Sequence, residues 1–153
     1  MAVRIENLSG RYEIELPTEK EKPWGYTISI HPKSVPAFLT QFFPEKMLGK
    51  DPSPRFLVVN AHSRLSWQAH KRRAEFWYVV QGPVGVLLSN TDDQPPAFET
   101  LHEGATVRIE PNMRHRLIGL EQEGIVAEVW IHTDPNNPSD ANDIVRLADD
   151  YLR

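Results

Sequence analysis

The chain has 153 residues, of which 40% are hydrophobic and 25% charged, the composition of an ordinary globular protein. This length fits one domain, so we expect a single domain over 1–153. The formal net charge of −4 excludes a basic whole-chain field for nucleic acid, and the absence of cysteine excludes disulfides, thiolate metal sites and cysteine nucleophiles.

No run of residues approaches the roughly 18 consecutive apolar positions of a membrane-spanning helix, so we expect no membrane segment. The N-terminal sequence MAVRIENLSGRYEIEL has no long apolar stretch, so we expect no secretory signal and a cytoplasmic protein.

Thirteen prolines against eight glycines interrupt the chain and disfavour long helices. Between them lie short runs rich in β-branched and aromatic residues. Many short strands joined by turns are typical of an all-β sandwich or barrel. We predict strands over 11–16, 26–30, 55–60, 64–68, 75–80, 84–89, 97–101, 105–109, 114–118 and 125–132.

Two segments depart from this strand pattern. In segment 32–54, the spacing of Phe38 and Phe42 predicts a short helix that Pro44 ends. We interpret this segment as an insertion that covers the flank of the barrel, with a lid or a dimer contact as the alternative. The tail over 134–153 begins as a polar linker, continues through a short apolar run and ends in charged residues.

The residues suited to chemistry gather around 68–75 and 110–115. Residues two apart in a strand face the same side, so Gln68 and His70 project together. Glu75 follows after a short turn and can return to the same point, and His115 stands beside a second turn. An amide oxygen, two imidazoles and a carboxylate make a donor set that suits zinc, with iron, manganese, cobalt and nickel as alternatives. We therefore predict one divalent metal ion at Gln68, His70, Glu75 and His115.

The spacing of these residues resembles the two sequence motifs of the cupin family. The first motif is matched in its second half by Gln68, His70, Glu75 and Gly82, with Gln68 in place of a histidine. This resemblance implies a double-stranded β-helix, a jelly-roll-like barrel, with its core at about 55–132. The second motif corresponds to Gly104, Glu110, Asn112, His115 and Gly119.

Within the cupins, three separated strings resemble the carboxy-terminal domain of type II mannose-6-phosphate isomerases. They are KPWG at 22–25, LSWQAHKRRAEFW at 65–77 and NDIVRLADDY at 142–151. The resemblance implies the same four metal ligands and assigns catalysis to Arg73. It does not imply GDP-mannose synthesis, because the nucleotidyltransferase domain that often precedes this cupin has no counterpart in the sequence.

The sequence departs from that family beside the proposed ligands. Lys71 and Arg72 replace two histidines, and Phe76 replaces the histidine after the glutamate. These differences leave the expected architecture unchanged and bear on which substrate the site would bind.

The implied reaction interconverts mannose 6-phosphate and fructose 6-phosphate through an enediolate. A divalent ion polarises the carbonyl, and a base moves the proton. Glu75 is a candidate base, although a metal-bound carboxylate is a poorer base than a free one, and Lys71 and His62 are alternatives. Cations are needed for the phosphate, and Lys22, Arg72 and Arg153 are available.

Two other classes of function stay open: another cupin enzyme, such as an epimerase or oxygenase on a small sugar or acid, and a sugar-binding cupin without turnover. The expected partners are a small sugar phosphate and a second copy of the chain. A homodimer is expected because Phe38, Phe42 and Phe43 would offer an apolar patch.

Overall fold

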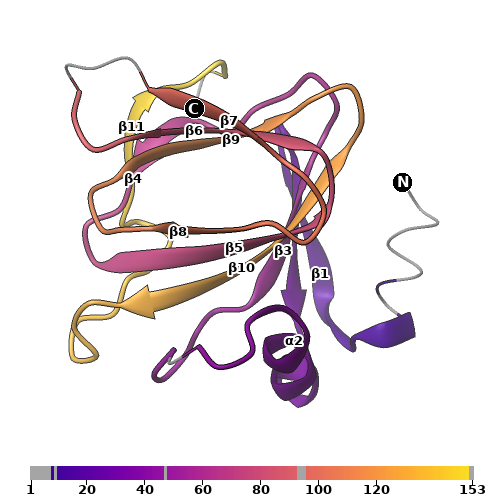
Figure 1. The fold of residues 1–153 in the computed structure, drawn as a ribbon. Helices are drawn as coiled ribbons and strands as arrows, with labels where there is room; N and C mark the ends of the chain where they lie inside the picture. The colour runs from indigo at the N-terminus through magenta and orange to yellow at the C-terminus, as the bar shows by residue number, and fades with distance from the viewer. Residues whose placement is uncertain (1–7, 9, 47, 93–95, 152–153) are drawn as a thin grey trace.

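Two antiparallel sheets face one another and form a β-barrel in the computed structural model, which describes residues 8, 10–46, 48–92 and 96–151 (Figure 1). The predicted all-β class is confirmed. In spatial order, the first sheet contains β1 (Ile14–Lys22), β2 (Gly25–Ile30), β3 (Arg55–Val59), β10 (Gly124–His132), β5 (Arg73–Gln81) and β8 (Thr106–Ile109). The second sheet contains β11 (Val145–Ala148), β4 (Trp67–Ala69), β9 (Arg114–Gly119), β6 (Val84–Ser89) and β7 (Ala97–Leu101).

The insertion over 32–54 contains the 3-10 turn η1 (Pro32–Ser34) and the helix α2 (Val35–Phe42). The helix ends where the sequence predicts, since the residue before a proline is disfavoured in helical conformation and Phe43 precedes Pro44. In Figure 1, α2 lies outside the barrel, beneath the first sheet.

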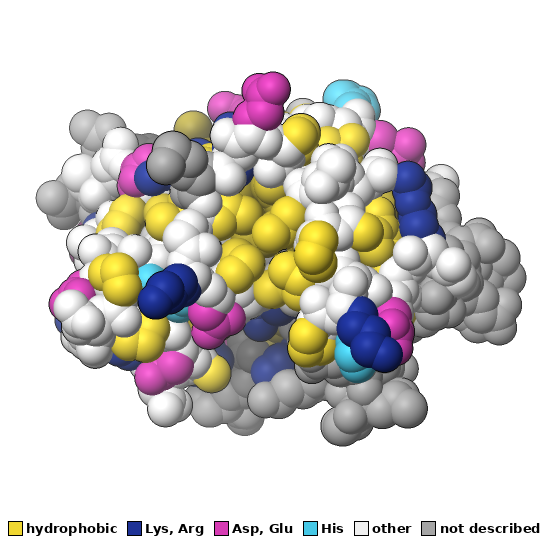
Figure 2. All heavy atoms as spheres, turned by 90° about the horizontal axis from the view of Figure 1, so that it is seen from below, with side chains coloured by type: hydrophobic (Ala, Val, Ile, Leu, Met, Phe, Trp, Pro, Cys, Tyr) yellow, Lys and Arg dark blue, Asp and Glu magenta, His cyan; other side chains and the backbone are white. Residues whose placement is uncertain are grey.

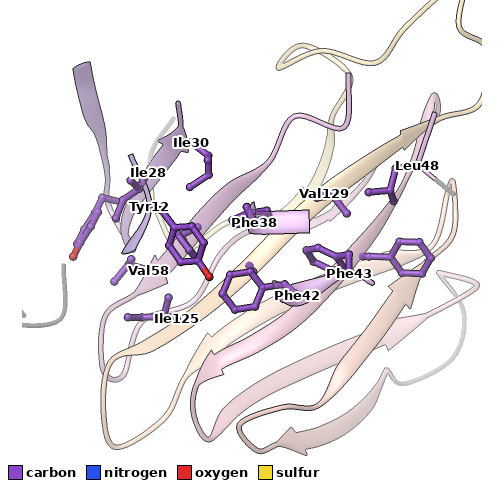
Figure 3. Close-up of a cluster of buried hydrophobic side chains, with 14 residues drawn as sticks. Tyr12, Ile28, Ile30, Phe38, Phe42, Phe43, Leu48, Val58, Ile125 and Val129 are labelled. Atoms are coloured by element: carbon purple, nitrogen blue, oxygen red, sulfur yellow. The ribbon is translucent and has the colours of Figure 1, made fainter. Parts of the chain in front are cut away.

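Aromatic side chains of α2 build a hydrophobic cluster on the outer face of the first sheet (Figure 3). Phe38 is fully buried, and its ring lies 5.1 Å from that of Phe42 and 5.2 Å from that of Phe56, both edge to face. Phe43 and Tyr12 belong to the same cluster. The insertion therefore covers the flank of the barrel, as the favoured interpretation has it.

The three phenylalanines on which the dimer prediction rested are buried within the chain. They are not available as a dimer contact, and the homodimer stays a prediction without that patch. Val35 and Leu39 of α2 are only partly buried, and Figure 2 shows hydrophobic side chains gathered on the face that is seen from below, the side of α2.

Successive residues of β5 and β10 alternate between this outer cluster and the interior of the barrel. Phe76 and Val129 belong to the outer cluster, whereas Trp77 and Val126 belong to the cluster between the sheets. Because both faces of these strands are covered, their sequences carry few charges. Any charged residue on the interior face therefore lies inside the barrel.

The first strand begins later than predicted. The sequence suggested a strand over 11–16, but Arg11 is helical and the Tyr12 amide donates to the Leu8 carbonyl at 2.8 Å. Strand β1 then runs on to Lys22 through Pro17. It lies at the edge of its sheet, where a proline removes no ladder hydrogen bond that the fold needs.

The second sheet differs from the prediction at two places. The strand expected over 64–68 begins only at Trp67, and Arg64 makes an isolated bridge to Ile118. Strand β11 was not predicted, because its four residues are all exposed and lack an apolar alternation. Its pairing with β4 specifies it instead. Among the described residues, no helix is long and apolar enough to cross a membrane.

Replacing Phe38 by alanine should lower the free energy of unfolding by about 3–5 kcal/mol, because the buried ring leaves a cavity among four aromatic neighbours. Urea denaturation measures this. Phe98→Ala is the control, since Phe98 is 53% exposed and its loss should change stability by less than about 0.5 kcal/mol. Equal stability losses in both variants would show that α2 is not packed as described.

Candidate metal centre and active-site cavity

A cavity of about 130 Å³ lies between the two sheets and is lined by residues of both, and by the C-terminal tail. Its walls combine three tryptophans with charged and polar side chains. The aromatic residues are Trp24, Trp77 and Trp130, and the polar ones are Lys22, Thr27, Arg55, Ser66, Gln68, His70, Arg73, Glu75, His115, Glu128 and Arg146.

Two histidines and a glutamate converge in this cavity. His115 on β9 pairs with Gln68 on β4, His70 follows β4, and Glu75 lies on the interior face of β5. His70 Nε2 is 3.3 Å from Glu75 Oε1, and His115 Nε2 is 3.6 Å from Glu75 Oε2. Zinc–ligand distances of about 2.0–2.2 Å place neighbouring ligand atoms of one ion roughly 3–3.5 Å apart. All three side chains are buried and their ligand atoms lie within 4.8 Å of one another, so small side-chain shifts would let them share one ion.

The tail and a turn fix the orientation of both imidazoles. His70 Nδ1 is 2.6 Å from the Asp143 carbonyl oxygen, and His115 Nδ1 is 2.9 Å from that of Met113. A carbonyl only accepts, so each Nδ1 carries a proton, and each Nε2 is turned toward the Glu75 carboxylate. Metal-bound histidines are typically held in this way. His115 Nε2 faces a Glu75 oxygen across 3.6 Å, a gap that a cation could bridge.

Burial and neighbouring charges separate the protonation states of His70 and Glu75. Burial lowers the pKa of His70 to about 4, against the opposing charge of Glu75. Burial disfavours the charged form of Glu75, yet the charges of His70, His115 and Arg73 hold its pKa below the usual range. At neutral pH the site thus offers a neutral imidazole and a carboxylate, the forms that bind metal.

Arg73 lies directly beside the proposed ligands. Its Nε donates to Glu75 Oε1 at 2.9 Å, and its Nη2 lies 3.1 Å from His70 Nε2. Its Nη1 donates to Ser139 Oγ at 3.0 Å, and its guanidinium carbon lies 3.7 Å from the centroid of the Trp130 ring. Stacking and hydrogen bonds on several sides fix the guanidinium in the cavity wall.

Asp143 ties the tail to the turn that follows His70. Its carboxylate accepts hydrogen bonds from Ser139 Oγ at 2.6 Å and from the amides of Lys71 at 3.0 Å and Arg72 at 2.9 Å. Burial opposes ionisation of this carboxyl, but these hydrogen bonds hold its pKa below the usual range. The same residue supplies the carbonyl that orients His70.

A second carboxylate, Glu128 on β10, lies inside the cavity wall. Arg55 Nε donates to its Oε1 at 2.7 Å, as does Trp130 Nε1 at 2.9 Å, and Trp77 Nε1 donates to its Oε2 at 2.8 Å. Burial raises the pKa of Glu128, which Arg55 opposes. The barrel therefore holds two buried carboxylates with different partners.

The structure brings Gln68, Arg73 and Lys22 to the cavity, together with the histidine–glutamate group. It does not bring Lys71 and Arg72 there. The Lys71 side chain is exposed, and Arg72 Nη1 donates to the Pro138 carbonyl at 2.6 Å, outside the cavity.

His62, the other alternative base, is also outside the cavity. Its side chain is 67% exposed and lies 3.7 Å from Glu121. Arg153, predicted to bind phosphate, lies outside the described residues.

Sequence reasoning missed three charged residues of the cavity wall, Arg55, Glu128 and Arg146. One signal was available for Glu128, since it is the single charge in the apolar run over 125–131. A lone charge in a strand that is buried on both faces indicates a polar interior partner. Arg146 had no such signal, because its strand has no apolar pattern.

His70→Ala and His115→Ala should each lose most of the bound metal while the barrel still folds, because each removes one of the two imidazole donors. Gln68→Ala should lose less, since a neutral amide oxygen is the weakest donor. Elemental analysis after dialysis measures metal content, with exposed His62→Ala as the control. Full occupancy in His70→Ala would show that the ligand group is misassigned.

Asp143→Ala should lower metal affinity by roughly 10–100-fold, because the carbonyl that orients His70 loses its anchor. Titration with a chromophoric chelator measures the affinity. Asp150→Ala is the matched control, since Asp150 also lies in the tail but makes an exposed ion pair with Arg64. Unchanged affinity in Asp143→Ala would mean that the tail does not support the site.

No protein-family model and no curated protein matches the sequence. Solved structures do match. CapF from Staphylococcus aureus, a capsular polysaccharide assembling protein, is similar with a TM-score of 0.63 and 13% identity, over 90% of this chain and 35% of its own. Oxalate decarboxylase from Bacillus subtilis has a TM-score of 0.61 and 14% identity, over 84% of this chain and 29% of its own.

A domain of Drosophila melanogaster CENP-C is also similar, with a TM-score of 0.56 and 11% identity, over 77% of this chain and 72% of its own. This chain thus spans about a third of the length of CapF or oxalate decarboxylase. At these identities the likeness concerns architecture. The chain has the cupin fold.

Proposed function

We propose that this chain is a metal-dependent sugar-phosphate isomerase that interconverts mannose 6-phosphate and fructose 6-phosphate. The observation that carries the proposal is the convergence of His70, Glu75 and His115 on one point of a buried cavity, with Arg73 beside them. The strings that resemble type II mannose-6-phosphate isomerases contain His70, Arg73 and Glu75, but not His115.

The charge of the cavity supports an anionic substrate. Four cations oppose two carboxylates in its wall, a formal excess of two positive charges before any metal binds: Lys22, Arg55, Arg73 and Arg146 against Glu75 and Glu128. A low-dielectric wall with one sign of charge attracts ligands of the opposite sign. A phosphate monoester, which carries two negative charges or nearly so, complements this excess.

Two of the four cations in the wall are paired with carboxylates. Arg55 and Arg73 are each held by a buried carboxylate. The side chain of Arg146 makes no hydrogen bond or ion pair within the part of the chain that the structure describes. Arginine binds phosphate through two parallel hydrogen bonds, so Arg146, with Lys22, is the proposed phosphate contact in place of Arg72.

A divalent ion at the three ligands would act as a Lewis acid on the oxygens of the sugar's first two carbons. Arg73 would stabilise the negative charge that develops on those oxygens, because its planar guanidinium is already oriented by Glu75, Ser139 and Trp130. The tryptophans and the closed barrel would exclude water from the reacting carbons.

One contact favours a second candidate, a sugar-binding cupin without turnover. Arg73 contacts both His70 and Glu75, and so balances the Glu75 charge by itself. A site neutralised in this way needs no ion to bind a neutral or anionic sugar.

Activity and metal dependence separate the two candidates. Purified protein should contain about one divalent ion per chain, and a coupled assay should detect conversion of fructose 6-phosphate, abolished by a chelator and restored by zinc or another divalent ion. Metal-replete protein that binds hexose phosphates in calorimetry but converts none would leave only the binding role.

Arg73→Ala should keep the fold and the metal, because the bound ion then balances Glu75, but should lose turnover by a factor on the order of 10²–10³. Both kcat and kcat/KM should fall, since the contact acts on charge formed in the transition state. Arg73→Lys should restore little, because an ammonium lacks the planar fork.

Arg108→Ala is the matched control for this loss, since Arg108 pairs with Glu110 on the surface. Equal rates in Arg73→Ala and in the wild type would show that Arg73 is only a structural residue.

A further inference from the structure

Glu128 is a buried carboxylate in the cavity wall that the proposed metal site does not use. It is 1% exposed, although it lies on the interior face of β10 and lines the cavity. A buried carboxylate needs compensation, and the structure provides it through three donors.

The three hydrogen bonds are divided unequally between the two carboxylate oxygens of Glu128. Oε1 accepts from Arg55 and Trp130, whereas Oε2 accepts only from Trp77 among the described residues. Each carboxylate oxygen has two lone pairs. Oε1 is therefore saturated, and Oε2 keeps one lone pair for a group in the cavity.

The strand register sets Glu128 close to the metal-ligand group but apart from it. In the β5–β10 ladder, Glu128 lies opposite Trp77, and Glu75 lies opposite Trp130. The two carboxylates thus stand on diagonal corners of one four-residue block, whose diagonal spans roughly 7–8 Å. A sugar carbon bound next to the ion would lie between them.

The two carboxylates also differ in electrostatic environment. The charges around Glu75 hold its pKa low, as suits a permanent metal ligand. Burial raises the pKa of Glu128, with Arg55 opposing and Glu75 adding to the rise. Two acidic groups whose pKa values are pushed apart typically take different roles in one reaction.

We propose that Glu128 is the proton-transfer residue of this site, an inference that rests on the proposed isomerase function. Its Oε2 takes the proton from C2 of the aldose phosphate. The C2–H electron pair forms the C1–C2 double bond, the π pair of the C1 carbonyl moves to its oxygen, and this oxygen takes up the proton that O2 gives up. Glu128 then returns its proton to C1, while O2 loses its own proton and C2 becomes the carbonyl carbon. The sum is an isomerisation with no added reactant.

A purely structural role for Glu128, as the counter-ion of Arg55, predicts a different outcome. Arg55 is partly exposed and also stacks over Trp130 at 5.2 Å, so it has other support. Two buried indole N–H groups aimed at one carboxylate orient it more strictly than charge balance requires. In the structural role, Glu128→Gln would change stability but not the rate of a folded, metal-loaded enzyme.

The test compares full-length, zinc-loaded wild type with Glu128→Gln on mannose 6-phosphate. Glu128→Gln should keep its metal and its KM but lose kcat by a factor of roughly 10²–10⁴, as expected for a lost general base. Proton exchange between C2 of the substrate and deuterated water, followed by NMR, should fall by the same factor. Glu121→Gln is the matched control, because it makes the same substitution at a side chain that is 90% exposed and outside the cavity, so the rate should not change.

Glu128→Asp covers the case in which the glutamine variant does not fold. It keeps the charge but withdraws the oxygen by one methylene, a misplacement that costs on the order of 10²-fold in rate. Wild-type rate and exchange in either folded variant would overturn the role of Glu128 while leaving the isomerase function intact. A metal-loaded wild type that converts no hexose phosphate would remove both proposals.

Discussion

The antiparallel pairing of β5 with β10 is the constraint on which the cavity depends. It sets Glu75 opposite Trp130 and Trp77 opposite Glu128, so that two carboxylates and two indoles face the interior together. The same pairing turns the alternate residues outward, where α2 covers them with aromatic side chains. A shift of β10 by one residue would exchange its two faces, which would turn apolar side chains such as Val129 into the cavity and place Glu128 against α2. Core packing and site geometry are therefore specified by one register.

The C-terminal tail completes the second sheet and the wall of the cavity. Strand β11 adds to the second sheet through β4, and the residues before it close the cavity wall. Asp143 joins this tail to the turn after His70, because its carboxylate accepts two hydrogen bonds from the amides of Lys71 and Arg72 and its carbonyl orients His70. Stability of the tail and competence of the site are thus linked, because release of the tail would free the imidazole and the Arg73 guanidinium at once.

Much of the fold and part of the site could be predicted from the sequence, because the informative patterns there are local. Short apolar runs between prolines identify most strands, and Gln68, His70 and Glu75 lie within eight residues of one another. Glu128 and its partners could not be placed, since a register between strands about fifty residues apart leaves no local pattern. Lys71 and Arg72 are positively charged, as catalytic residues often are, but their backbone amides donate hydrogen bonds to Asp143 in the tail. The Lys71 side chain is exposed, and the Arg72 side chain donates to the Pro138 carbonyl outside the cavity.

The central claim is that three side chains from separate parts of the barrel bind one metal ion. Anomalous diffraction at the zinc edge, from crystals of zinc-loaded protein, tests it most directly. The account predicts one peak in the cavity, about 2.0–2.2 Å from His70 Nε2, His115 Nε2 and a Glu75 carboxylate oxygen. A saturated crystal with no peak there, and with Arg73 still bonded to His70 Nε2, would contradict it.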